Sequence, residues 1–183
     1  MRFGLVVLSL LATFAFGAPA GGDASALREK YKALEVELRD NAFGRPLHLD
    51  SKEWWSELMG DAYAVVAQPF AKAGAALAEP ANWCDILMLP FNTKQCRVLR
   101  ETKGNAGEPV LDVRIGRKSE DNAEQAYPVK FQYRLAGIST ELLQVRLGAA
   151  DGPLSTHDYR IALEAIPLPG DRTFLHLSYA YRF

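Results

Sequence analysis

Histidine is a common general base in enzymes, and it occurs three times in this chain, as His48, His157 and His176. No two of them have the spacing of an H-E-x-x-H zinc motif, and the sequence holds no G-x-x-x-x-G-K-[ST] phosphate loop. The run Ser155-Thr156-His157-Asp158 places polar groups side by side, but neighbours along a strand point to opposite faces. We therefore interpret this run as a turn that leads into a strand. The sequence predicts no catalytic residue, no metal site and no cofactor.

The two cysteines, Cys84 and Cys96, are separated by eleven residues. A redox pair normally has the C-x-x-C spacing, which this is not. In an oxidising compartment a small, even number of cysteines indicates a structural disulfide, with two buried free thiols as the alternative. We predict the disulfide.

The first twenty residues have the three-part form of a secretory signal peptide. Arg2 precedes the uncharged run 3–16, and small residues follow up to Ala20. The run holds 14 residues, whereas a helix needs about 20 to span a bilayer. We predict cleavage after Gly17 or after Ala20, and secretion across the inner membrane into the periplasm. Residues 1–20 are thus assigned to the signal peptide.

The overall composition excludes one class of partner. The chain has 183 residues, 49% of them hydrophobic, with 21 Lys and Arg against 22 Asp and Glu. Binding to the nucleic-acid backbone needs a basic excess, which is missing, so we predict no nucleic-acid partner.

The elements that would position any site begin with a predicted helical segment, residues 21–59. Apolar residues in 23–40 recur at spacings of 4, 3 and 4, which predicts one amphipathic helix that docks on the domain. Ser51 is expected to cap a second short helix that carries Trp54 and Trp55 as packing anchors and ends at Gly60.

Residues 60–183 are predicted to form a sheet domain. The segment 62–67 is expected to be a strand, followed by a helix from Pro69 to about Glu79 and a shorter one, 81–87, that holds Trp83. Pro90 is expected to end the second helix.

Six further segments read as consecutive strands. Five of them alternate apolar and polar residues with period two, as strands with one dry and one wet face do, and Gln95 to Leu99 adds the sixth. Turn signals such as Lys103-Gly104-Asn105 and Asp151-Gly152-Pro153 separate them, which predicts an antiparallel meander.

His176 falls on the polar, or wet, register of the last strand, where we expect a solvated surface residue. That register also holds eight basic positions against three acidic ones. The default interpretation is a plain solvated sheet surface, and the alternative is a surface that favours anionic head groups of a membrane. The basic positions are Arg114, Lys118, Lys130, Arg134, Arg146, Arg160, Arg172 and Arg182.

This order of elements resembles the START-like, polyketide-cyclase-like helix-grip fold, over roughly residues 60–181. It is an α+β fold with an antiparallel, curved sheet of six or seven strands and short helices after the first strand. Several short motifs also look like those of exported bacterial proteins of uncharacterised function: Gln68-Pro69-Phe70, Asn82-Trp83-Cys84-Asp85, Asn92-Thr93-Lys94-Gln95-Cys96, Asp151-Gly152-Pro153-Leu154 and Asp158-Tyr159-Arg160.

The resemblance implies an apolar cavity, since members of the wider fold bind lipids, sterols or aromatic polyketides and only some are enzymes. We therefore expect an exported protein that binds or carries a hydrophobic small molecule or lipid. With the shared parity of the strands, the resemblance gives the residues expected to line the cavity: Trp83, Phe131, Tyr133, Tyr159, Leu175 and Tyr179.

The chain departs from the fold at Phe183, because it stops where a long covering helix should begin. Three ways of covering the dry face remain open: the helix at 23–40, a second copy of the chain in a homo-oligomer, or a truncated product that leaves the face bare. The ending Tyr181-Arg182-Phe183 also supports an alternative, an outer-membrane β-barrel-type protein. A cyclase or hydrolase that uses the same cavity is a further alternative.

Overall fold

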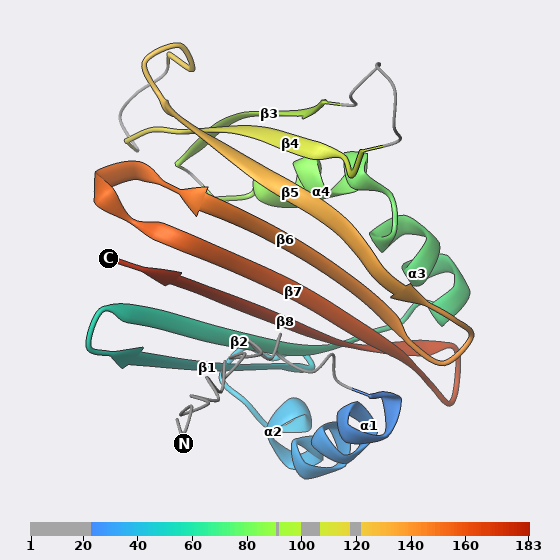
Figure 1. Ribbon diagram of the computed structural model, residues 1–183. Coiled ribbons are helices and arrows are strands. Elements are labelled where there is room, and N and C mark those ends of the chain that lie inside the picture. The colour runs from blue at the N-terminus through green and yellow to red at the C-terminus, as the bar shows by residue number, and fades with distance from the viewer. Residues whose placement is uncertain (1–22, 91, 100–106, 118–121) are drawn as a thin grey trace, which may run out of the picture.

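Eight antiparallel strands form one curved, open sheet in the computed structural model, which describes residues 23–90, 92–99, 107–117 and 122–183 (Figure 1). The strands are β1 (Leu47–Trp54), β2 (Glu57–Val66), β3 (Thr93–Leu99), β4 (Val110–Ile115), β5 (Tyr127–Ile138), β6 (Leu143–Asp151), β7 (His157–Leu168) and β8 (Arg172–Arg182). The helices are α1 (Ala24–Ala33), α2 (Glu35–Arg39), α3 (Phe70–Leu77) and α4 (Pro80–Leu87), with a 3-10 turn, η1, at Pro153–Ser155. The predicted signal peptide, the turn at 103–105 and Lys118 lie outside the described residues.

The strand order is β1-β2-β8-β7-β6-β5-β4-β3, so β2 pairs with the last strand of the chain. Strands β3 to β8 form the predicted six-strand meander. Strand β2, helices α3 and α4, and then this meander confirm the helix-grip-like arrangement. Of the described strands, β1 is the one that the sequence pattern did not predict.

The helix expected from Ser51 to Gly60 is wrong. These residues belong to a hairpin in which Trp54 of β1 lies opposite Glu57 of β2. Strand β2 is also paired along its whole length with β8, for example Leu58 with Tyr181. Pairing on both sides fixes an extended backbone and overrides the local helical pattern, because strand preference depends on cross-strand partners.

The same hairpin leaves the two tryptophans in solvent, so their predicted role as packing anchors is also wrong. The exposed fraction is 68% for Trp54 and 87% for Trp55.

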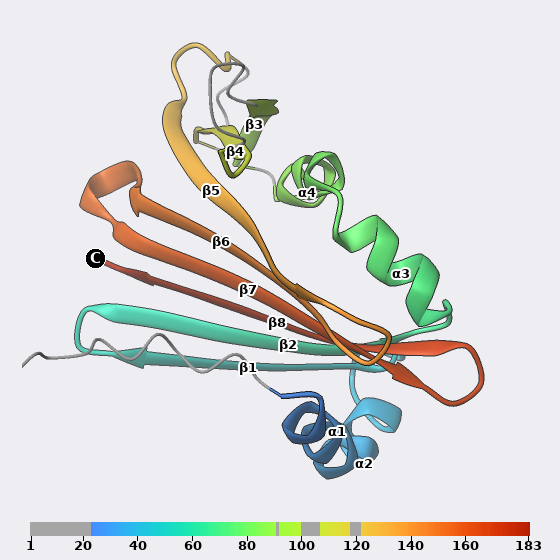
Figure 2. The ribbon, with the colours of Figure 1, turned by 45° about the vertical axis from the view of Figure 1, so that its right-hand side comes forward.

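Helices α3 and α4 lie over the dry face of the sheet (Figure 2). Pro80 stands at the first position of α4, where its missing N–H costs no hydrogen bond. Cys84 of α4 is bonded to Cys96 of β3, with the two Cα atoms 5.2 Å apart, which confirms the predicted disulfide. A crosslink over so short a loop stabilises a fold by roughly 3 kcal/mol in the chain-entropy account.

Helices α1 and α2 pack on the opposite face of the sheet, α1 against β7 and α2 against β1 and β2 (Figures 1 and 2). The side chain of Asp23 caps α1 by accepting hydrogen bonds from the backbone N–H groups of Ser25 and Ala26, and these bonds lower the pKa of its carboxyl. The helix predicted over 23–40 is interrupted at Leu34.

A second hydrophobic cluster holds these two helices in place. Its buried members are Leu27, Leu34, Leu38, Tyr63, Ile166 and Phe174. Of the three ways left open for covering the dry face, the N-terminal helix is therefore excluded, because it uses its apolar stripe on the other face. Among the described helices, none combines the length and the apolar character that a membrane crossing requires.

Candidate ligand-binding site

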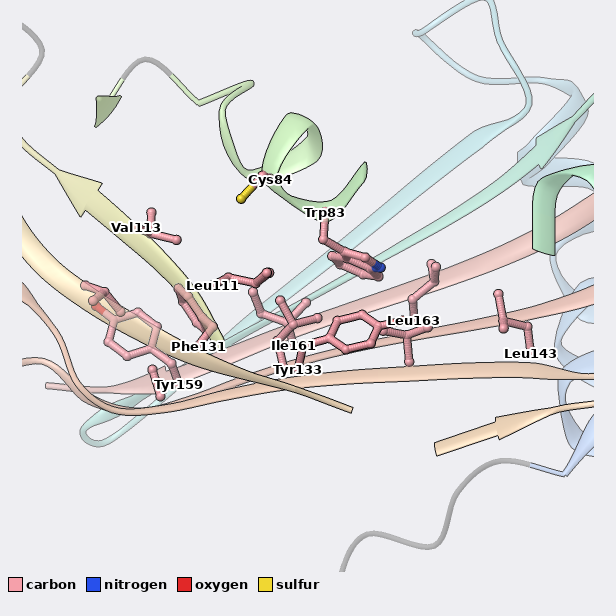
Figure 3. Packing of buried hydrophobic residues seen from close by; sticks show 14 of the residues in the cluster. Trp83, Cys84, Leu111, Val113, Phe131, Tyr133, Leu143, Tyr159, Ile161 and Leu163 are labelled. Atoms are coloured by element: carbon pink, nitrogen blue, oxygen red, sulfur yellow. The ribbon is translucent and has the colours of Figure 1, made fainter. Parts of the chain in front are cut away.

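The dry face of the sheet carries most of the hydrophobic core, and the aromatic side chains of α4 and β5 are at its centre (Figure 3). Trp83 is 1% exposed, and its indole N–H donates to the carbonyl oxygen of Leu77 at 2.7 Å. The hydroxyl of Tyr133 donates to the carbonyl oxygen of Ala78 at 2.6 Å. Each buried ring thus satisfies its polar group at the end of α3: the first bond joins α4 to α3, and the second joins the end of α3 to β5 of the sheet.

The residues predicted to line a cavity fall into two groups. Trp83, Phe131, Tyr133 and Tyr159 are buried and packed into one cluster, whereas Leu175 and Tyr179 on β8 are only half-buried. The structure therefore brings the first four together as packing partners and places the other two toward the uncovered side. Their role in ligand binding stays a prediction.

A row of aromatic rings connects these two groups. The ring of Tyr181 stacks on that of Tyr159, with centroids 5.2 Å apart, and lies 5.7 Å from the ring of Tyr179. Burial, with the neighbouring tyrosines adding to it, raises the pKa of Tyr179 well above its ordinary value. Its hydroxyl is therefore protonated at neutral pH and is available as a hydrogen-bond donor rather than as a base.

An apolar hollow of about 350 Å³ lies beside this row, over β1, β2 and β8. Alternation places six of its lining residues on the dry face: Leu49, Ser51, Gly60, Ala62, Leu177 and Tyr179. Gly60 and Ala62 have little or no side chain, which creates the space, and Leu49 is 51% exposed. We refer to this feature as the apolar hollow.

Sequence reasoning missed this site, apart from Tyr179, because it assigned residues 51–60 to a helix. A signal was present in the alternation of Leu47 and Leu49 with His48 and Asp50. This alternation spans too few residues to distinguish a strand from the end of a loop.

The acidic residues that border the hollow, Asp50 and Asp61, have partners elsewhere. Asp61 accepts a hydrogen bond from His176 across the polar face, and Asp50 lies 3.8 Å from the ammonium of Lys52. Of the described residues with side chains on the dry side of the hollow, Tyr179 is the titratable one. This surface is therefore suited to holding an apolar molecule, and it offers two hydroxyls, from Ser51 and Tyr179, as polar contacts.

The polar face of the sheet contains a second, wider groove of about 740 Å³. His176 lies in it with its side chain 19% exposed, so the expectation of a solvated surface residue is wrong. Its Nε2 is 2.7 Å from Asp61, its Nδ1 is 3.7 Å from Glu164, and its ring stacks on Tyr63 with centroids 4.4 Å apart. Burial lowers the pKa of His176, but the two carboxylates outweigh it and raise the pKa overall.

At least three of the eight basic residues predicted on this face form ion pairs. Arg160 bonds Glu57, Arg182 lies 3.5 Å from Asp158, and Arg134 lies 3.3 Å from Glu108. These pairs neutralise part of the positive character expected from the basic register, and attraction to anionic head groups stays a prediction. Within the described part of the chain, no group of three His, Cys, Asp or Glu residues has an arrangement that could hold a metal ion.

The comparison with known proteins finds similarity in structure but not in sequence. No protein-family model and no curated protein matches the sequence. The chain is similar to the Zhui aromatase/cyclase from Streptomyces sp. R1128, with 17% identity, a TM-score of 0.46 and coverage of 73% of this chain and 68% of the other. It is similar to norcoclaurine synthase from Thalictrum flavum, with 17% identity, a TM-score of 0.47 and coverage of 68% and 69%.

A START superfamily protein from Mycobacterium smegmatis is also similar, with 16% identity, a TM-score of 0.46 and coverage of 68% of this chain and 76% of the other. At these identities and TM-scores the likeness carries no argument about function. The helix-grip-like arrangement of this chain stands on its own strand order and on the position of α3 and α4.

Proposed function

We propose that this protein is exported and binds a hydrophobic small molecule or lipid in the apolar hollow. The observation that carries the proposal is that the dry face is only partly covered. Over β4 to β7 it is packed beneath α3 and α4, whereas the residues of β1, β2 and β8 that line the apolar hollow are half-buried or exposed. A ligand there would bury apolar area at about 25 cal/mol per Å².

The volume of the hollow limits the ligand. About 350 Å³ is at the small end of the range of pockets that hold drug-sized molecules. The ligand is therefore a small apolar compound, or one part of a longer lipid, with a polar group able to reach Ser51 or Tyr179.

The disulfide supports the proposed export. Cys84 and Cys96 are bonded, and such bonds persist in oxidising compartments. The signal peptide predicted at residues 1–20 supports the periplasm as this compartment. We propose binding of a ligand rather than its chemical conversion, because the polar side chains on the dry side of the hollow are the hydroxyls of Ser51 and Tyr179, and neither is a general base at neutral pH.

The proposal is tested on protein purified from the periplasmic fraction of an expressing bacterium. Its intact mass is expected to lack the first 17 or 20 residues, depending on the cleavage site. An organic extract, analysed by mass spectrometry, is expected to contain an apolar compound in stoichiometric amount. The delipidated protein should then bind the probe N-phenyl-1-naphthylamine at one saturable site.

Two matched substitutions locate the site. Ala62→Leu fills the hollow and is expected to weaken probe binding at least tenfold, while Ala180→Leu adds the same volume on the polar face and should leave binding unchanged. Equal effects of both variants would place the probe elsewhere, and a ligand-free protein that takes up no probe would contradict the proposal.

A further inference from the structure

Four large apolar side chains are exposed at one end of the sheet. The exposed fraction is 94% for Leu154, 87% for Trp55, 68% for Trp54 and 50% for Phe183. They come from three separate segments: the end of β1 with the β1–β2 turn, the η1 turn between β6 and β7, and the residue after β8. We call these four residues the rim.

The register of the strands brings the three segments together. Arg182 of β8 is paired with Glu57 on one side and with His157 on the other, so the ends of β2, β8 and β7 are level. The N–H of Phe183 donates to the carbonyl oxygen of Ser56 at 3.0 Å. Because neighbouring strands are about 4.8 Å apart, the ends of β2 and β7 that enter the two turns are roughly 10 Å apart, with the end of β8 and Phe183 between them. Figures 1 and 2 show both turns and the C-terminus at the same end of the sheet.

The backbone holds two of these side chains in an unusual conformation. Trp55 has φ 52° and Leu154 has φ 57°, in the left-handed region that bulky residues rarely adopt. Glycine or asparagine would make either turn with less strain, and the β7–β8 turn at the other end does use Gly170, with φ 77°. The turns at the rim therefore keep large apolar side chains where packing within the chain gives them no benefit.

A lipid bilayer is the partner that fits this arrangement. Tryptophan is enriched at membrane interfaces, because its ring is apolar and its N–H can bond to head groups. Side chains on separate turns protrude independently, and a bilayer accepts them without the matching pockets that a protein partner would need. Arg182, the residue before Phe183, lies within 4.0 Å of both Glu57 and Asp158, so apolar insertion rather than this charge must provide the affinity.

The rim is also connected to the apolar hollow. The ring of Phe183 lies 6.2 Å from that of Tyr181, which lies 5.7 Å from that of Tyr179, a lining residue of the hollow. An apolar row thus runs along β8 from the exposed end of the sheet to the proposed site.

We propose that the rim inserts into the interfacial layer of a lipid bilayer and docks the protein with this end of the sheet toward the membrane. The proposal goes beyond ligand binding, since it depends on the exposed side chains of the rim and not on an occupied hollow.

The test is flotation of the full mature protein with phosphatidylcholine vesicles. The wild type is expected to float, and the double variant Trp54→Ser/Trp55→Ser should lower the partition coefficient at least tenfold. Leu154→Ser should lower it about threefold, because one inserted side chain contributes less burial than two. Addition of 0.5 M NaCl should change the result by less than about twofold, since charge screening leaves apolar insertion intact.

The matched control is Ile138→Ser, which removes an apolar side chain that is 59% exposed at the other end of the sheet. It should float like the wild type. All variants are compared by circular dichroism, and brominated phosphatidylcholine should quench exposed tryptophan in the wild type while buried Trp83 gives the unquenched background.

Three results would overturn the proposal. They are failure of the wild type to float, an equal loss in Ile138→Ser, and flotation only with anionic vesicles that salt abolishes. A rim variant that changes the sedimentation coefficient but not flotation would assign the rim to a second copy of the chain instead. Probe binding by Ala62→Leu is measured without vesicles, so failure of the membrane proposal can be told apart from failure of the ligand proposal.

Discussion

His176 shows how one side chain acquires its properties from distant partners. Asp61, 115 positions earlier, accepts its Nε2 hydrogen bond, and Glu164 on the neighbouring strand faces its Nδ1. The flat stacking of its ring on Tyr63 connects this polar group to the cluster beneath α1 and α2. A protonated ring carries an N–H toward both carboxylates, whereas a neutral ring has only one N–H to donate.

The raised pKa of His176 predicts a pH-dependent stability. A histidine whose pKa is higher in the folded than in the unfolded chain stabilises the fold fully below its ordinary value of 6.5. That contribution is lost as the pH rises through the folded-state value. The free energy of unfolding, measured by urea denaturation at a series of pH values, should therefore fall across this window in the wild type.

His176→Gln is expected to remove this slope, and His157→Gln, which changes an exposed histidine, should keep it. If the slope persists in His176→Gln, another group is responsible for it.

At the scale of elements, α2 illustrates that a five-residue helix depends on its contacts. So short a helix is not stable by itself in water, so burial of its apolar side must hold it. Leu38 is 4% exposed and belongs to the cluster with Ile166 and Phe174, whereas Val36 of the same helix is 60% exposed.

These two positions form a matched pair for mutation. Leu38→Ala should lower the free energy of unfolding by about 2–4 kcal/mol, because it leaves a cavity between the helix and the sheet. Val36→Ala should change it by less than about 0.5 kcal/mol, because it removes a solvent-exposed group. Chemical denaturation followed by circular dichroism measures both, and similar losses in the two variants would mean that α2 is not docked as described.

For the whole molecule, the two faces of the sheet are energetically connected through β7. Leu163 and Ala165 belong to the cluster under α3 and α4, while Ile166 belongs to the cluster under α1 and α2. A strand cannot leave one cluster without disturbing the other. Both layers should therefore unfold together.

This predicts a single transition. The fluorescence of buried Trp83 reports on the dry face, and far-UV circular dichroism reports on all elements, including α1 and α2. The urea midpoints of the two signals should coincide, and Leu38→Ala should lower both by the same amount. A circular dichroism change that precedes the fluorescence change would show instead that the N-terminal helices come off first.

Much of the architecture follows from local patterns. Period-two alternation correctly assigned the dry-face residues of β5 to β8, because an extended chain points successive side chains to opposite faces whatever it packs against. Pro69 correctly marked the start of α3, where it stands at the N-cap, since a proline acts on its own backbone. The cysteine spacing and the predicted compartment led to the Cys84–Cys96 bond.

The apolar hollow and the rim could not be predicted in this way. Both depend on the β1–β2 hairpin, where pairing with β8 overrode a helical pattern and turned Trp54 and Trp55 outward. The neighbours of His176 likewise depend on which strands lie side by side.

By itself, the sequence determined the order of most elements, their wet and dry sides and the disulfide. The tertiary structure alone decided which face α1 and α2 cover, where the dry face stays open and what surrounds His176. The physical reason is that alternation and proline geometry are properties of a few adjacent residues. Strand pairing and helix docking are instead set by the free energy of contacts between residues such as Asp61 and His176, which only the complete fold brings together.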